Sequence, residues 1–193
     1  MTSNQLKVIF VGSTGVGKTS LINYFKGEDI SVNRTTSTIE PVNYGCEVVN
    51  SRNIKVKLDL WDTAGQEEYQ AISPMYYRNA DVAVVCANSA NINSLKQWIQ
   101  RVLDVSPDCV IYIAITMSDL MSMDDQQEAE KAAQDLISQG LAESCFITSA
   151  KTGDSVSSLF GEIADTNVKM TSKPKVVELN NETNNKKNEG GCC

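Results

Sequence analysis

Apolar and polar residues follow two different periods along the chain, and together these periods predict an α/β domain. Continuous apolar runs, typical of strands buried in a parallel sheet, occur at 6–11, 82–87 and 110–115, and a last short strand is predicted at 145–148. Between them, apolar residues recur at helical spacing, which predicts helices at 20–25, 67–79, 93–105, 124–139 and 156–168, the second of them irregular. This alternation predicts a largely parallel sheet with helices on both faces.

Two further strands are predicted at 42–49 and 54–61, with a hairpin turn at 50–53 between them. Residues 55–60 alternate between polar and apolar, so one face of the second strand is expected to contact water. The predicted sheet therefore has six strands, mostly parallel, with one antiparallel hairpin at its edge. The helices predicted at 93–105 and 156–168 are expected to turn these residues inward: Leu95, Trp98, Ile99, Val102, Val156, Leu159, Phe160 and Ile163.

A glycine-rich segment, residues 12–19, joins the first strand to the first helix and fits the pattern G-x-x-x-x-G-K-[ST] without a mismatch. Its glycines allow successive N–H groups to point at a polyphosphate, and the following helix N-terminus adds partial positive charge. Lys18 would place a full charge on the β- and γ-phosphates, and the Thr19 hydroxyl can bind Mg²⁺. The alternative to a phosphate-binding loop is an ordinary glycine-rich turn that contains a lysine by chance. The predicted phosphate-binding residues here are Ser13, Thr14, Gly15, Val16, Gly17, Lys18, Thr19 and Ser20.

Other polar segments also follow apolar strands, namely 62–65, Asp119 and 149–151. Because ligands of such sheets bind at the carboxyl ends of the strands, we expect these segments and the glycine-rich loop to converge on one edge. The sequence itself therefore predicts a site built from residues far apart in the chain.

Composition narrows the possible functions. The 193 residues carry a net charge of −7, which disfavours a nucleic-acid partner. There is no histidine, so catalysis would rest on carboxylates, amides, lysine or a metal ion. Cys46, Cys86, Cys109 and Cys145 lack metal-ligand spacing and are expected to be small apolar residues or free thiols.

The ends of the chain suggest where the protein is found. No segment approaches the ~20 consecutive apolar residues of a membrane span, and the N-terminus lacks a signal-like region, so we expect a cytosolic protein. Residues 169–193 are rich in Asn, Lys and Glu, and we expect this tail to stay disordered because it has little apolar surface to bury.

Three motifs carry a resemblance to a known family: 61–67 (Trp-Asp-Thr-Ala-Gly-Gln-Glu), 75–81 (Met-Tyr-Tyr-Arg-Asn-Ala-Asp) and the terminal Gly-Gly-Cys-Cys of 190–193. With them, nearly the whole chain resembles the Ras superfamily of small GTPases, and within it the Rab branch. The resemblance implies a P-loop GTPase domain at 1–168 and a flexible tail at 169–193. It also implies a Mg²⁺-dependent switch that binds GDP and GTP, hydrolyses GTP slowly and recruits effectors in vesicle traffic.

The resemblance also assigns roles to residues. Thr19, Thr38 and Asp62 are expected at the Mg²⁺ ion, and Thr38 and Gly65 at the phosphates. Gln66 is expected to orient the attacking water, although alone it would be a solvated loop amide. The Asp119 carboxylate would accept hydrogen bonds from guanine, or else cap a helix before Leu120. The residues expected at the guanine base are Thr116, Met117, Asp119, Leu120, Ser149, Ala150 and Lys151.

Several positions depart from the family pattern. The usual Asn-Lys-x-Asp is replaced by 116–119, Thr-Met-Ser-Asp, so Met117 brings no ammonium group to the base. The aromatic residue that often flanks guanine should fall near Asp29 or Ile30, and neither is aromatic, which predicts weaker nucleotide binding. Glu40 replaces an expected glycine, the segment up to Trp61 is one residue longer, and Glu68 stands where Rab proteins usually carry arginine. Three residues therefore compete with Thr38 for Mg²⁺: Thr35, Thr36 and Ser37.

Partners follow from the resemblance too. It implies an exchange factor, a GTPase-activating protein, a GDP-dissociation inhibitor or escort protein, and effectors at switch I (around Thr38) and switch II (around Gln66). Three aromatic residues resemble the Rab effector-facing triad, or else pack between the hairpin and a helix: Tyr44, Trp61 and Tyr76. Prenyl groups on Cys192 and Cys193 would hold the protein on the cytoplasmic face of an endomembrane, from which it cycles to the cytosol.

Two other functions remain open at this point. A nucleotide-binding scaffold with little turnover would agree with the altered base motif, whereas Lys18, Gly65 and Gln66 speak against it. A P-loop kinase or ATPase of small substrates would share the phosphate loop, whereas Asp119 and 149–151 speak against it.

Overall fold

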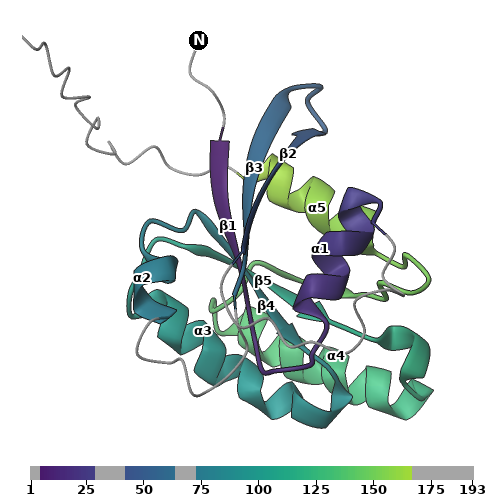
Figure 1. The fold of residues 1–193 in the computed structure, drawn as a ribbon. Helices are drawn as coiled ribbons and strands as arrows, with labels where there is room; N and C mark the ends of the chain where they lie inside the picture. Colours follow the sequence, from purple (N-terminus) through teal and green to yellow (C-terminus); the bar gives the residue numbers. More distant parts are fainter. Residues whose placement is uncertain (1–4, 29–41, 64–72, 167–193) are drawn as a thin grey trace, which may run out of the picture.

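The computed structural model describes residues 5–28, 42–63 and 73–166, and these form one six-stranded sheet with helices on both faces (Figure 1). The strand order is β2-β3-β1-β4-β5-β6. The strands are β1 (Gln5–Val11), β2 (Val42–Val49), β3 (Lys55–Asp62), β4 (Val82–Ala87), β5 (Val110–Ile115) and β6 (Ser144–Ile147). All six predicted strands are confirmed, with boundaries that shift by one residue at most.

The pairing of the strands is as predicted. β2 pairs with β3 antiparallel, and every other neighbouring pair is parallel. The turn between β2 and β3 closes with a hydrogen bond from Asn50 N–H to the Ile54 carbonyl, and Asn53 adopts φ 59°, a conformation that asparagine tolerates better than most residues. Along β3, exposed and buried side chains alternate, because only one face of this strand lies on the core.

Two hydrophobic cores lie on opposite faces of the sheet. On one face, α1 (Lys18–Lys26) and α5 (Val156–Asp165) lie side by side, and Phe25 stacks on Phe160 with 3.6 Å between ring centroids (Figure 1). The other face is covered by α2 (Ser73–Tyr77), α3 (Leu95–Leu103) and α4 (Met123–Ser138). The eight residues of α3 and α5 that were predicted to point inward are all buried.

Some helix boundaries differ from the prediction. The segment predicted as one helix at 93–105 begins as a 3₁₀ helix, η2 (Ser89–Ser94), and α3 starts only at Leu95. The Asn88 side chain accepts a hydrogen bond from Ala90 N–H and so starts η2 earlier than the apolar spacing indicates. Helix α5 ends at Asp165 rather than at 168, and within 67–79 the described helix covers only Ser73–Tyr77.

The cysteines of the described part of the chain are free thiols, as expected. Burial raises the pKa of Cys86, Cys109 and Cys145 to about 12 each, so these side chains are neutral at physiological pH. None of the helices within the described ranges combines the length and the apolar character that crossing a membrane requires.

Candidate nucleotide-binding site

The carboxyl ends of the parallel strands bring the predicted site residues to one edge of the sheet. The glycine-rich loop follows β1, Asp62 ends β3, Thr116 follows β5 and Ser149 lies just beyond β6. Hydrogen bonds join these loops directly, from Thr116 to Val16 and from Ser149 to Asp119. The predicted convergence is therefore confirmed for the described residues.

The backbone of the glycine-rich loop requires glycine at particular positions. Gly12 adopts φ 142°, and a Cβ there would overlap the carbonyl oxygen of Cys86 on β4. Gly17 adopts φ 92° immediately before α1, again in the region that side chains disfavour. The loop can therefore press close to β4 and still lead straight into the helix N-terminus, the arrangement that binds anions.

Lys18 lies inside the loop and is 6% exposed. Its Nζ donates hydrogen bonds to the carbonyl oxygens of Gly12 at 2.9 Å and Ser13 at 3.0 Å. Burial lowers the pKa of Lys18, whereas the neighbouring Cys86 and Asp62 side chains act in the opposite direction. The ammonium group is thus held at the centre of the loop by carbonyl oxygens, within reach of any phosphate that the loop binds.

Thr19 and Asp62 form the predicted oxygen pair for Mg²⁺. The Thr19 hydroxyl donates to Asp62 Oδ2 at 2.6 Å, and Asp62 is only 1% exposed. A hydroxyl and a carboxylate oxygen are hard ligands of the kind that Mg²⁺ prefers, so this pair fits the ion. The other residues expected at the ion and the γ-phosphate lie outside the described residues: Thr35, Thr36, Ser37, Thr38, Gly65 and Gln66.

The altered base motif is tied to the phosphate loop. The buried Thr116 hydroxyl lies 2.5 Å from the Val16 carbonyl and 3.1 Å from the Ala87 carbonyl, and so links β5 to both the loop and β4. Met117 adopts φ 61°, and its methyl group lies 3.6 Å from where a Cβ on Gly17 would be. Thr116 therefore links the loops, and the apolar side chain of Met117 lies against the glycine-rich loop.

Asp119 is held by the loop after β6. Its carboxylate accepts a hydrogen bond from Ser149 Oγ at 2.7 Å and lies 3.4 Å from Lys151 Nζ. The Ser149 hydrogen bond is the main cause that lowers the pKa of Asp119, opposed by partial desolvation and supported by Lys151. Asp119 is thus a carboxylate at neutral pH. The helix-cap alternative is wrong, because Asp119 lies within the 3₁₀ turn η3 (Ser118–Leu120) and its carboxylate contacts another loop.

The remaining predicted residues surround these contacts. Ser149 is fully buried, Ala150 is half-buried, and Leu120 is 73% exposed beside Asp119 in the sequence. One contact leaves no signal in the sequence: Trp98 Nε1 lies 3.4 Å from Ser13 Oγ and so joins α3 to the glycine-rich loop. The helical period placed Trp98 on the inward face, but its partner could not be read from that period.

Comparisons with known proteins agree with this geometry. A family model described as the Ras family matches residues 7–169. The chain belongs to the Ras family, and within it to the Rab branch. The chain is 33% identical over 204 aligned positions to the Ras-related protein Rab-24 of Dictyostelium discoideum, covering 100% of this chain and 98% of that protein.

Two further relatives support the same assignment. The GTP-binding protein ypt5 of Schizosaccharomyces pombe is 35% identical over 167 positions, covering 85% of this chain and 78% of its own length. The Ras-related protein RABF2b of Arabidopsis thaliana is 32% identical over 200 positions, covering 99% and 96%. Identities near one third over the length of a domain leave room for the altered motifs described above.

The Rab-like aromatic triad is only partly present. Trp61 and Tyr76 pack together with 6.0 Å between ring centroids, but Tyr44 does not join them. In the hairpin register Asn43 stands opposite Trp61, whereas Tyr44 stands opposite Leu60 and packs on the other face of the sheet. There Lys26 Nζ lies 3.8 Å from the centre of the Tyr44 ring. Tyr44 therefore does not share a face of the sheet with Trp61 and Tyr76, so for Tyr44 both the triad and packing beside these two residues are wrong.

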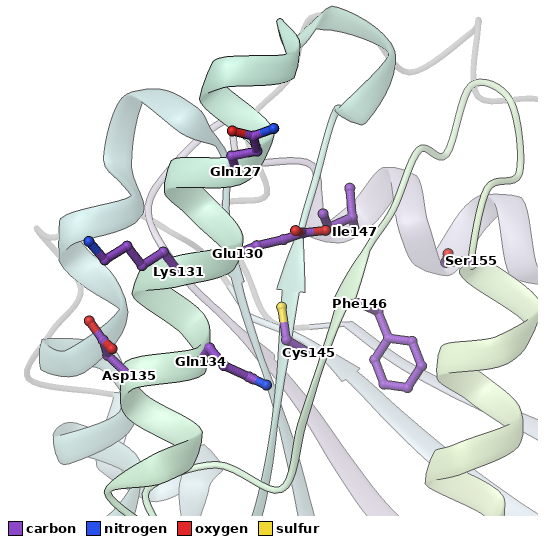
Figure 2. A pocket seen from close by; sticks show the side chains of 9 residues that line it. All are labelled: Gln127, Glu130, Lys131, Gln134, Asp135, Cys145, Phe146, Ile147 and Ser155. Atoms are coloured by element: carbon purple, nitrogen blue, oxygen red, sulfur yellow. The ribbon is translucent and has the colours of Figure 1, made fainter.

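A separate cavity of about 760 Å³ lies between α4 and the edge strand β6 (Figure 2). Its walls carry Glu130 and Lys131 from α4 and Cys145 from β6. The predicted nucleotide-binding residues within the described ranges are not among the residues that line it. The cavity therefore belongs to the flank of the domain rather than to the site at the strand ends.

The Ser149–Asp119 hydrogen bond yields a measurable prediction. Replacement of Ser149 by alanine removes the donor that stabilises the charged form, so the pKa of Asp119 should rise toward its ordinary value. The bond favours the folded state above the ordinary carboxyl pKa, and this stabilisation is lost as pH falls through the lowered one. Carboxyl ¹³C NMR titration measures the shift. An unchanged Asp119 pKa in Ser149→Ala would show that this bond does not hold the carboxylate charged.

Proposed function

We propose that the protein is a guanine-nucleotide switch that binds GDP and GTP. The observation that carries the proposal is the joint arrangement of Lys18 in a glycine-rich loop and of the Asp119 carboxylate, held by Ser149 and Lys151, on one edge of the sheet. A carboxylate accepts hydrogen bonds only, and guanine offers it two donors, N1–H and the 2-amino group. Adenine offers no such pair, so this arrangement favours guanine.

Each residue of the site has a role in this proposal. Lys18 and the loop N–H groups hold the phosphates, while Thr19, Thr38 and Asp62 hold Mg²⁺, which when bound neutralises charge on the β- and γ-phosphates. Gly65 contacts the γ-phosphate, and the Gln66 amide orients a water molecule for in-line attack on phosphorus. The bond from the γ-phosphorus to the bridging oxygen breaks, and GDP and phosphate leave.

Hydrolysis in this proposal is slow without help. The residues assigned to the proposed site include no arginine to stabilise the charge that develops on the transferred phosphate, and an arginine supplied by another protein is worth ~10³–10⁵ in rate in this enzyme class. A GTPase-activating protein would supply that residue, and an exchange factor would replace GDP by GTP. Switch I and switch II would then be ordered by the γ-phosphate and recruit effectors.

The proposal places the protein in vesicle-mediated protein transport, on the cytoplasmic face of an endomembrane. Its net charge of −7 gives the whole chain no general attraction to an anionic membrane. Two prenyl groups, on Cys192 and Cys193, would supply stable anchoring, since one lipid chain gives only marginal binding. A GDP-dissociation inhibitor or escort protein would shield these groups in the cytosol. Residues 1–168 would form the GTPase domain and 169–193 the flexible tail.

A scaffold with little turnover is the second candidate, and Met117 is the observation that favours it. Met117 lies against Gly17 without contributing an ammonium group, so the nucleotide loses a charged contact that the family usually provides. The P-loop kinase or ATPase alternative is disfavoured, because the Asp119–Ser149 pairing gives the site an acceptor suited to guanine.

The phosphate loop is tested by the exchange of Lys18 for alanine. GTP and GDP affinity should fall by more than ~10²-fold, because the charge at the centre of the loop is lost. In the unmodified protein, ATP should compete only poorly with GTP for the site. Calorimetric titration measures both effects. Lys131→Ala, on the exposed face of α4, is the matched control and should bind normally. Equal GTP affinity of Lys18→Ala and the control would overturn the assignment of this loop.

Single-turnover hydrolysis separates the switch from the scaffold. The unmodified protein should convert bound GTP to GDP slowly, and Gln66→Leu should bind GTP normally but hydrolyse it at least ~10-fold more slowly, because it lacks the water-orienting amide. Radiolabelled phosphate release measures the rate. If the unmodified protein does not hydrolyse GTP, the scaffold is favoured. If Gln66→Leu hydrolyses GTP as fast as the unmodified protein, Gln66 has no role in catalysis.

A further inference from the structure

The end of α1 that lies away from the phosphate loop contacts the loop that carries Ser149. Tyr24, on α1, reaches Gly153, and a Cβ built on Gly153 would overlap the Tyr24 hydroxyl and ring. Gly153 also adopts φ 88°, a conformation that disfavours side chains. The tyrosine therefore occupies the space that a side chain at Gly153 would fill, and the two residues pack in direct contact.

Gly153 closes the turn that positions Ser149. Its N–H donates to the Ser149 carbonyl at 2.8 Å. Within the turn, the N–H groups of Lys151 and Thr152 each donate to Ser149 Oγ at 3.2 Å, and Ser149 Oγ in turn donates to Asp119 at 2.7 Å. A chain of contacts thus runs from the Tyr24 ring through Gly153 and Ser149 to the Asp119 carboxylate.

The turn is otherwise exposed on its outer side. Lys151 and Thr152 are exposed, and the Lys151 side chain is 62% exposed while it reaches toward Asp119. Exposed polar side chains restrain a turn weakly, because water competes for their hydrogen bonds. An aromatic ring packed against the turn is a stiffer restraint, since its position follows from the helix that carries it.

Helix α1 is packed against α5 immediately beside this contact. It begins at Lys18, and Tyr24 follows six residues later, about 9 Å along the helix axis. The next residue, Phe25, stacks on Phe160 of α5 with 3.6 Å between centroids and 2° between ring planes. One rigid helix therefore carries the predicted phosphate ligands at its start and the Tyr24 contact near its end.

We propose that Tyr24 is a positioning residue for base recognition. Its ring restrains the 149–153 turn, so that Ser149 presents its hydroxyl to Asp119 and the carboxylate keeps the orientation in which it accepts both guanine donors. The inference rests on the proposed guanine site and deepens it, because it assigns part of the base specificity to a residue of the phosphate-side helix.

The test compares GDP with IDP, whose hypoxanthine base lacks only the 2-amino group. In the unmodified protein, GDP should bind more tightly than IDP because Asp119 accepts from that group. Tyr24→Ala should lower the GDP/IDP affinity ratio about tenfold, the value of one lost hydrogen bond of ordinary strength. Tyr24→Phe, which keeps the ring, should change the ratio by less than about twofold. Fluorescent-nucleotide competition measures all three ratios.

A matched variant separates positioning from general packing. Phe25→Leu, on the neighbouring residue, loosens the contact with Phe160 but leaves the 149–153 turn untouched, so it should lower stability without changing the GDP/IDP ratio. If Tyr24→Ala does not fold by circular dichroism, Tyr24→Leu, which is too short to reach Gly153, replaces it and should give the same loss.

The two proposals fail in different ways. An unmodified protein that binds GDP and IDP equally would overturn the guanine site itself. A clear GDP preference that survives in Tyr24→Ala or Tyr24→Leu would overturn only the role of Tyr24, and so would an equal loss of the ratio in Phe25→Leu.

Discussion

The buried parallel strands impose the constraint on which the site depends. Every residue of β4 is buried, and β1 and β5 are nearly so, which leaves polar residues to the loops that follow these strands. Those loops lie at one edge, where their polar side chains bond to neighbouring loops and strands: the Thr116 hydroxyl bonds to the Val16 carbonyl of the glycine-rich loop, and Thr63 Oγ1 donates to the Phe10 carbonyl of β1 at 2.6 Å. The predicted phosphate and base subsites are therefore parts of one hydrogen-bonded layer.

The departures from the family pattern leave this layer of hydrogen bonds intact. Thr116 keeps the loops joined although it is not the usual asparagine, and Met117 fills space against Gly17 without a charge. On the hairpin, the register places Asn43 opposite Trp61 and turns Tyr44 to the other face of the sheet. The chain thus retains the Ras-type fold, while side chains depart from the family pattern in the 116–119 motif and on the β2–β3 hairpin.

Much of the fold could be predicted from the sequence because short buried strands and amphipathic helices leave strong periodic signals, as in β4 and α3. The conformation of the glycine-rich loop could be predicted because Gly12 and Gly17 meet a local backbone requirement. Contacts between distant loops left no such signal: Thr116 with Val16, Trp98 with Ser13 and Tyr24 with Gly153 each depend on tertiary packing. The turn of Tyr44 away from Trp61 depends on strand register, which composition does not specify. The roles of Thr38, Gly65, Gln66, Cys192 and Cys193 stay predictions, since these residues lie outside the described ranges.

The central claim is that Asp119 reads the guanine base, and an exchange of nucleotide specificity tests it most directly. In Asp119→Asn, the amide nitrogen would face the 2-amino group of guanine donor to donor, whereas it could donate to the 2-oxo group of xanthine. The account predicts that GDP affinity falls and XDP affinity rises, so that the preference between them reverses, as measured by competition against a fluorescent nucleotide. A variant that keeps the full GDP preference of the unmodified protein would contradict the account.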